Sequence, residues 1–154
     1  MVKRFNNDVL RSSDSSVIIM KSELPKGNRG SLLNLFECTL FNIHMSMRYL
    51  ETKNQEGIIQ FLVHKLHDEP IENLDLYLPQ LCYLILTKPD PGCIRVLEKF
   101  ILQLSMANSN LGFRALHYFF SWSEDDALKA RYADEAVKFY NLLEGALVNQ
   151  DLPK

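Results

Sequence analysis

The chain has 154 residues, of which 47% are apolar, and its 17 basic and 19 acidic side chains give a formal charge of -2. This length suffices for one hydrophobic core and is short for two ordinary domains. The near balance of charge argues against the basic surface that binding to nucleic acid, or flat adsorption to an anionic membrane, would need. No segment reaches the roughly 18 uncharged apolar residues of a membrane helix. The N-terminus lacks the apolar run of a signal peptide, so we expect a soluble, cytoplasmic protein.

Serine, glycine, proline and mixed charges dominate residues 1–30, which we predict to be a flexible N-terminal tail. Two interpretations of this tail stay open. It is either an end without function or a short linear motif, formed by the apolar run VIIM or by phosphorylation of the serines that follow Arg11. We predict one helical domain at residues 31–150 and a short tail at 151–154.

Apolar residues recur every three or four positions from residue 31 onwards, as in amphipathic helices. The first helix is predicted from Ser31 to about Leu50, and the second from Gly57 to His67. The third contains Pro79, which is costly inside a helix because proline removes a backbone hydrogen bond. A cap at Asn73 or Asp75 would place Pro79 just past the first turn, where it would tilt the helix instead of breaking it.

Three further helices follow, and their starts carry capping residues. Asp90 is predicted to cap the fourth helix, with Pro91 in its first position. Asn108 or Ser109 is predicted to cap the fifth, and the last helix to run from about Ala127 to Asn149. No segment shows the alternation of an exposed strand.

Two of the predicted helices resemble each other in sequence. GIIQFLVHKL from Gly57 is similar to GCIRVLEKFI from Gly92, an offset of 35 residues, which is close to the period of two-helix repeats. We therefore predict an all-α fold, a solenoid-like stack of about three antiparallel helical hairpins of the HEAT or armadillo kind. Such folds bind partners on their concave or end surfaces.

The sequence offers little that indicates catalysis. The glycines at PKGNRG follow no strand and end in no Gly-Lys-Ser, and no G-x-S-x-G segment occurs. His64 and His67 are interpreted as a surface pair at a helix end, with a metal site as the alternative. His44 and His117 are predicted to be packed and hydrogen-bonded. We predict no catalytic, cofactor-binding or metal-binding residue in this chain.

Cysteine and aromatic side chains are predicted to belong mainly to the core. The three cysteines are predicted to be reduced, buried thiols: Cys38, Cys82 and Cys93. The fifth helix carries an aromatic set: Phe113, Tyr118, Phe119, Phe120 and Trp122. Several rings of the run from Tyr118 to Trp122 are predicted to point into the core, with a binding surface as the alternative.

Three segments carry a resemblance to a known family. Residues 75–86, DLYLPQLCYLIL, resemble the tyrosine-leucine-proline-glutamine-leucine signature of the accessory helical domain of phosphoinositide kinases, and residues 97–120 resemble the helical pair that follows it. Residues 35–66 are most similar to the amino-terminal helical unit of type III beta phosphatidylinositol 4-kinases. We interpret the signature as structural, with its proline setting the bend between hairpins: Tyr77, Leu78, Pro79, Gln80 and Leu81.

The resemblance implies a non-catalytic domain of a larger lipid kinase that phosphorylates phosphatidylinositol at the 4-hydroxyl on Golgi-type membranes. ATP and Mg²⁺ would then belong to a kinase domain that this chain does not contain. The implied partners are a Rab-type small GTPase and the kinase domain of the same protein, with peripheral membrane association through the parent only and no nucleic acid. The alternative is a stand-alone helical-repeat adaptor that binds a peptide or a small GTPase.

Overall fold

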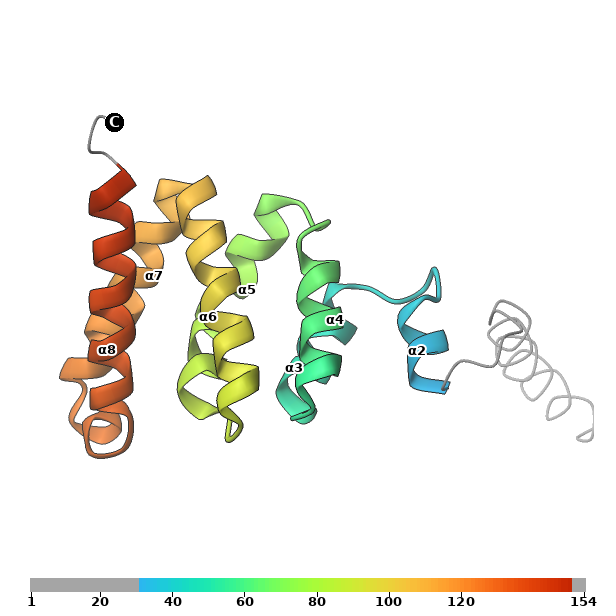
Figure 1. The fold of residues 1–154 in the computed structure, drawn as a ribbon, viewed down its shortest axis with the longest axis horizontal. Coiled ribbons are helices and arrows are strands. Elements are labelled where there is room, and N and C mark those ends of the chain that lie inside the picture. The colour runs from blue at the N-terminus through green and yellow to red at the C-terminus, as the bar shows by residue number, and fades with distance from the viewer. Residues whose placement is uncertain (1–30, 151–154) are drawn as a thin grey trace, which may run out of the picture. The chain divides into compact units, whose positions relative to one another are not determined.

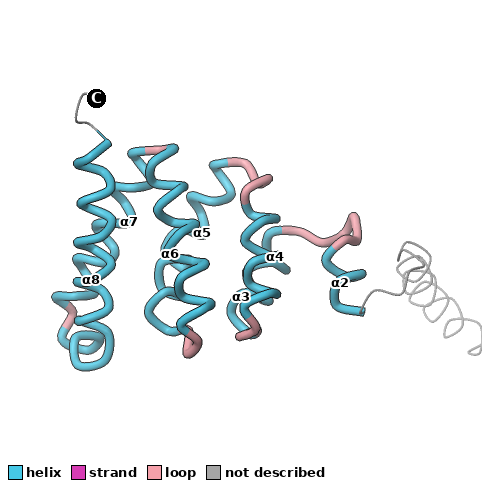
Figure 2. Tube along the Cα trace, in the orientation of Figure 1, coloured by secondary structure: helices cyan, strands magenta, loops and turns pink. Residues whose placement is uncertain are grey.

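The computed structural model describes residues 31–150. The predicted tails, including VIIM and the serines after Arg11, lie outside these residues. The chain divides into two units between Asn42 and Ile43, and each unit is treated by itself. Within residues 31–150 there are seven helices and no strand (Figure 2), which confirms the all-α prediction.

The first predicted helix is interrupted. Helix α2 spans Ser31–Phe36 and α3 spans Ile43–Thr52, so the prediction of one helix from Ser31 to Leu50 is wrong. Between them the chain turns, and the Cys38 amide donates to the Leu35 carbonyl at 3.2 Å. The intervening segment contains threonine and asparagine, whose side chains compete for backbone hydrogen bonds and favour turns and helix starts over helix interiors. The apolar spacing gave no sign of this break because it continues across the turn.

Helices α3 to α8 form the second unit, and the bounds of α4 to α8 follow the predicted ones within a few residues. After α3 come α4 Glu56–Leu66, α5 Ile71–Thr87, α6 Pro91–Ala107, α7 Ser109–Glu124 and α8 Asp126–Gln150. Consecutive helices contact each other in the pairs α3 with α4, α5 with α6, and α7 with α8. Figure 1 shows α4, α6 and α8 side by side, with α3, α5 and α7 behind them, and the contacts of α4 with α6 and of α5 with α7 agree.

The core of this unit is formed by the apolar stripe of each helix. Its fully buried side chains come from every helix of the unit: Leu50, Ile59, Leu62, Leu78, Leu81, Leu97, Ile101, Phe119 and Leu143. Gly112 allows a close approach of three helices, because a Cβ atom there would lie 3.0 Å from Leu147 Cδ2 and 3.1 Å from Ser105 Cβ. A side chain at Gly112 would therefore push α6, α7 and α8 apart, at a cost typical of overpacking.

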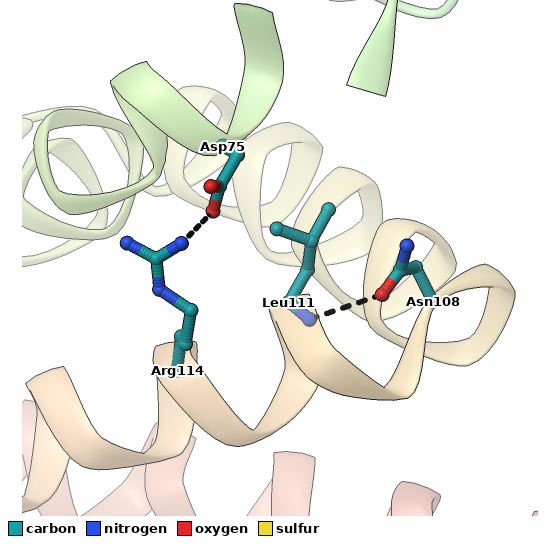
Figure 3. Close-up of polar contacts among 4 residues, drawn as sticks. All are labelled: Asp75, Asn108, Leu111 and Arg114. Atoms are coloured by element: carbon teal, nitrogen blue, oxygen red, sulfur yellow. Dashed lines mark hydrogen bonds and ion pairs between the residues drawn. The ribbon is translucent and has the colours of Figure 1, made fainter. Parts of the chain in front are cut away.

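Two helix caps predicted from the sequence are present. The Cys93 amide donates to Asp90 Oδ2 at 2.9 Å, with Pro91 as the first residue of α6. This hydrogen bond lowers the pKa of the Asp90 carboxyl. The Leu111 amide donates to Asn108 Oδ1 at 3.2 Å at the start of α7 (Figure 3), so Asn108 and not Ser109 is the cap. Each cap satisfies a backbone amide that has no partner within the helix.

Replacement of Asn108 by alanine is expected to lower the free energy of unfolding by about 1 kcal/mol, because the Leu111 amide loses its acceptor. Asn110 lies in the first turn of the same helix and is exposed, so Asn110→Ala serves as the matched control and is expected to change stability by less than about 0.5 kcal/mol. Urea unfolding of both variants, followed by circular dichroism, measures the difference. Equal effects would show that Asn108 does not cap α7.

The partly buried carboxyl of Glu98 on α6 makes stability depend on pH. Burial raises the pKa of Glu98 above its usual value, and the positive charges of Lys138 and Arg95 oppose this only in part. The folded state therefore holds the Glu98 proton more tightly than the unfolded chain. The resulting stabilisation is present below the unfolded pKa and is lost as the pH rises through the folded pKa.

Replacement of Glu98 by glutamine is accordingly expected to raise the urea midpoint at pH 7, because the ionised carboxylate is no longer desolvated on folding. The gain should shrink towards zero below about pH 4, where the wild-type carboxyl is protonated in both states. Glu98 and Glu135 line one cleft between α6 and α8, and Glu135 is exposed, so Glu135→Gln provides the control variant. A gain that does not depend on pH would contradict the assignment.

Candidate functional site

The cleft between α4 and α6 is the candidate functional site. It has a volume of about 320 Å³ and is lined by Gln60, Val63, His64, His67, Val96, Lys99, Phe100 and Gln103. The sequences of α4 and α6 are similar at an offset of 35 residues, and this similarity relates some of the lining residues to each other. His64 and Lys99 occupy equivalent positions in the two segments, and both line the cleft because α4 and α6 pack against each other.

The cleft combines an apolar floor with a polar rim. Val63 and Phe100 are buried, and the His67 ring meets the Phe100 ring edge to face with 4.9 Å between centroids. His64 and Lys99 are exposed, and no ion pair of Lys99 is present among residues 31–150. An apolar base surrounded by hydrogen-bond donors is the arrangement typical of protein interfaces, where a buried centre is enclosed by polar contacts.

His64 and His67 therefore lie in one cleft, as their spacing of three residues suggested. Both are exposed, which agrees with their interpretation as a surface pair at the end of α4. Within the described residues no group of three or more histidine, cysteine, aspartate or glutamate side chains could hold a metal ion. The lining of the cleft also contains Lys99, whose ammonium repels cations. The arrangement favours contact with a protein over metal binding.

The signature at Tyr77 to Leu81 lies in the middle of α5. Leu78 and Leu81 are fully buried, whereas Tyr77, Pro79 and Gln80 are half-buried. The Tyr77 hydroxyl shares a hydrogen bond with Nδ1 of His44 on α3. On the same helix, the Asp75 carboxylate pairs with the guanidinium of Arg114 on α7 (Figure 3). Side chains of α5 thus connect it to α3 and α7.

Pro79 does not lie where the sequence placed it. Helix α5 begins at Ile71 with Pro70 as its N-cap residue, so the prediction of a cap at Asn73 or Asp75 is wrong. The amides of Asn73 and Leu74 both donate to the Pro70 carbonyl, which extends the helix one turn upstream. Pro79 is therefore interior, and the Asp75 carbonyl lacks the backbone donor that any other residue at position 79 would supply.

The two remaining histidines differ from their prediction, whereas the cysteines agree with theirs. His44 and His117 are exposed, so the prediction that they are packed is wrong, although His44 is hydrogen-bonded as expected. The cysteines are buried and free, as predicted: Cys38, Cys82 and Cys93. Burial raises the pKa of the Cys82 and Cys93 thiols, which keeps them in the poorly nucleophilic thiol form.

The aromatic residues of α7 are only partly in the core. Phe119 is fully buried, and Tyr118 and Trp122 are half-buried. Phe113 and Phe120 are 61% and 54% exposed, so Phe120 is the ring of the run from Tyr118 to Trp122 that points away from the core. Consecutive helical residues point about 100° apart, so a run of adjacent rings cannot all face one core.

Sequence reasoning missed Lys88, which is only 6% exposed. Its ammonium donates to the Glu51 carbonyl at 2.9 Å, the Lys53 carbonyl at 2.6 Å and Asn54 Oδ1 at 3.0 Å. Burial lowers the pKa of Lys88. All three ammonium protons have acceptors, so Lys88 holds the loop between α3 and α4 against the end of α5. No spacing rule marks such a lysine, because its acceptors lie more than 30 residues away in sequence.

The α4 to α6 cleft was not predicted from the sequence either. Sequence reasoning noted both the helical repeat and the histidine pair but did not combine them. Adding 35 to the position of His64 gives Lys99, so the repeat could have placed these two side chains together.

No helix in the described part of the chain is long and apolar enough to cross a membrane.

Comparison with known proteins gives consistent matches. Residues 45–113 match the family described as PI4KB/PIK1, accessory (PIK) domain. Phosphatidylinositol 4-kinase beta 2 of Arabidopsis thaliana is 26% identical over 93 residues, which cover 60% of this chain and 8% of that protein. Phosphatidylinositol 4-kinase pik1 of Schizosaccharomyces pombe is 32% identical over 98 residues, 62% of this chain and 11% of that protein.

Phosphatidylinositol 4-kinase beta of Xenopus laevis is 40% identical over 50 residues, 32% of this chain and 6% of that protein. The matched segments thus span about a tenth or less of the curated relatives. No solved structure matches the chain. The matched residues include the cleft lining, the Tyr77 to Leu81 signature and Lys88. The helical segment at residues 45–113 is therefore similar to the accessory (PIK) domain of the PI4KB/PIK1 family.

Proposed function

We propose that this chain is the non-catalytic accessory domain of a phosphatidylinositol 4-kinase, which positions the kinase domain and binds regulatory proteins. The match of residues 45–113 to the accessory domain carries this proposal. The parent enzyme would phosphorylate phosphatidylinositol at the 4-hydroxyl and would hold ATP and Mg²⁺ in a separate kinase domain. In this proposal the chain is cytoplasmic and reaches Golgi membranes peripherally, through the parent.

We also propose that the hairpins of residues 43–150 form a solenoid-like stack of the HEAT or armadillo kind. Contacts within each helix pair, and between α4 and α6, α6 and α8, and α5 and α7, support this arrangement. The sequence similarity at an offset of 35 residues supports it as well. In such a stack the clefts between equivalent helices lie along one continuous surface, which suits the binding of a folded partner.

We propose the α4 to α6 cleft as the docking surface for a Rab-type small GTPase. The buried Val63 and Phe100 would take an apolar side chain of the partner, and His64, His67 and Lys99 would meet its carbonyl or carboxylate groups. The cleft lies within the family match, and its rim residues His64 and Lys99 are exposed, whereas Val63 and Phe100 belong to the core. Substitutions of the exposed rim residues are therefore expected to affect binding without affecting the fold.

The docking proposal is tested with bead-bound chain and a panel of Rab-type GTPases loaded with a non-hydrolysable GTP analogue or with GDP. One member is expected to bind preferentially in the GTP form, and Lys99→Glu or His67→Glu to weaken that binding at least about tenfold, or 1.4 kcal/mol. Lys65→Glu is the matched control, since Lys65 lies on α4 but does not line the cleft. Binding that is insensitive to both cleft variants, or the lack of any GTP-dependent binding, would refute this docking surface.

A further inference from the structure

A second surface is formed by exposed side chains of α7 and α8, the last helix pair of the unit. On α7, Phe113 and Phe120 each follow a buried residue by one position and are themselves exposed. On α8, Val137 and Val148 follow a buried residue in the same way and are also exposed. Both helices therefore carry two adjacent apolar stripes, one in the core and one in solvent. A helix that is apolar on more than one side is normally covered on each of them.

The two exposed stripes meet in one surface. The Phe120 ring lies beside the Tyr140 ring of α8, with 6.2 Å between centroids. Gly112 of α7 lies against Leu147 of α8, so the two helices run antiparallel. Phe113 and Val148, which each follow one of these two residues, therefore lie at the same level along the pair. We call this surface the outer face, and its apolar members are Phe113, Phe120, Val137, Tyr140 and Val148.

Two exposed carboxylates border the outer face. Glu144 lies one turn after Tyr140 on α8, and its carboxylate accepts a hydrogen bond from the Tyr140 hydroxyl at 3.2 Å. The negative charge of Glu144 raises the pKa of Tyr140. Glu124 lies one turn after Phe120 on α7. Among the described side chains neither carboxylate forms an ion pair, so both can take a cation from a partner.

Basic side chains of the same two helices are directed elsewhere. Arg114 of α7 pairs with Asp75 on α5, and Lys138 of α8 lines the cleft between α6 and α8. The charge that borders the outer face is therefore negative. A negative border opposes contact with an anionic membrane. It also opposes pairing with a second copy of the chain, because the same carboxylates would then face each other. The charge favours a basic partner.

We propose that the outer face binds an amphipathic α-helix of a partner protein, whose apolar stripe is flanked by lysine or arginine. Phe113 and Phe120 are seven residues, or two helical turns, apart on α7. Apolar side chains at positions i and i+7 of a partner helix have the same separation, which is the usual spacing of anchors in this binding mode. Glu144 lies between the levels of the two phenylalanines, where it would meet a cation midway along the partner helix.

The test uses the full chain and two labelled peptides of about 15 residues, long enough to form a helix when bound. Both carry leucine at every third or fourth position, and the flanking positions are lysine in one peptide and glutamate in the other. Fluorescence anisotropy is expected to show saturable binding of the lysine peptide and at least tenfold weaker binding of the glutamate peptide. Phe120→Ala should weaken binding of the lysine peptide at least tenfold. Glu144→Lys should reverse the preference between the two peptides.

Each variant has a matched control. Leu76→Ala removes an exposed apolar side chain from α5, and Glu135→Lys reverses a charge of α8 that lines the α6 to α8 cleft. Both are expected to bind the lysine peptide as the wild type does. Circular dichroism melting of every variant separates loss of binding from loss of fold.

The proposed occupant is wrong if the lysine peptide shows no saturable binding or if the two peptides bind equally. It is wrong as well if folded Phe120→Ala binds the lysine peptide as the wild type does, or if Glu135→Lys changes binding as much as Glu144→Lys. A wild-type dimer that Phe120→Ala converts to a monomer in sedimentation velocity would show that a second copy occupies the outer face. These outcomes do not depend on the docking of a GTPase between α4 and α6.

Discussion

Leu78→Ala is expected to lower the free energy of unfolding by about 3 kcal/mol, the largest effect of any single substitution proposed for this chain. Leu78 belongs to the family signature and is fully buried on α5. Alanine would remove its contacts and leave a cavity that the surrounding helices cannot fill, because α5 packs against α3, α6, α7 and α8. Urea unfolding monitored by circular dichroism measures the loss.

The matched control for Leu78→Ala lies two residues away on the same helix. Leu76 is 70% exposed, so Leu76→Ala is expected to change the free energy of unfolding by less than about 0.5 kcal/mol. The pair separates a structural role of the signature from a role in binding. A similar small loss in both variants would mean that Leu78 does not form part of the core, and the structural interpretation of the signature would fail.

Lys88→Met is expected to lower the free energy of unfolding by about 2 kcal/mol, although methionine matches the lysine stem in length. The substitution leaves the carbonyls of Glu51 and Lys53 without their donor in a partly buried loop. Cys93 Sγ, which donates to the Asn54 carbonyl at 3.3 Å, would still contact this loop. We expect faster hydrogen exchange of the loop amides as well as a lower urea midpoint.

Lys99→Met is the control for Lys88→Met, because Lys99 is exposed and donates no hydrogen bond to another residue among residues 31–150. Its effect on unfolding should stay within about 0.5 kcal/mol. If the two variants lose the same stability, the contacts of the Lys88 ammonium contribute nothing measurable. If Lys88→Met is the more stable variant, desolvation of the charge outweighs its hydrogen bonds.

The helices of the second unit were predictable because their signals are local. The Asp90 and Asn108 caps depend on a side chain and an amide three residues away, which a sequence displays directly. The break between Phe36 and Ile43 was not predictable, because the apolar spacing continues through it. The start of α5 was missed because its N-cap is Pro70, whose side chain makes no capping hydrogen bond and which therefore resembles a loop residue.

The candidate sites were less predictable than the fold, because they join residues that are distant in sequence. The His64 and His67 pair was visible, but Lys99 joins it only through the packing of α4 on α6. The aromatic run of α7 was visible too, but the partner of its exposed Phe120 is Tyr140 of α8. Periodicity tells which residues share a face of one helix, whereas a site requires knowing which faces of two helices meet.

The measurement that tests the account most directly uses the native protein. An antibody against residues 43–150 immunoprecipitates it from its own cells, and the precipitate is incubated with ATP, Mg²⁺ and phosphatidylinositol vesicles. The proposed function predicts a phosphatidylinositol product phosphorylated at the 4-position, with activity that is removed when the antibody is blocked by purified chain. A precipitate that contains the chain and forms no such product would contradict the kinase account and favour a stand-alone helical adaptor.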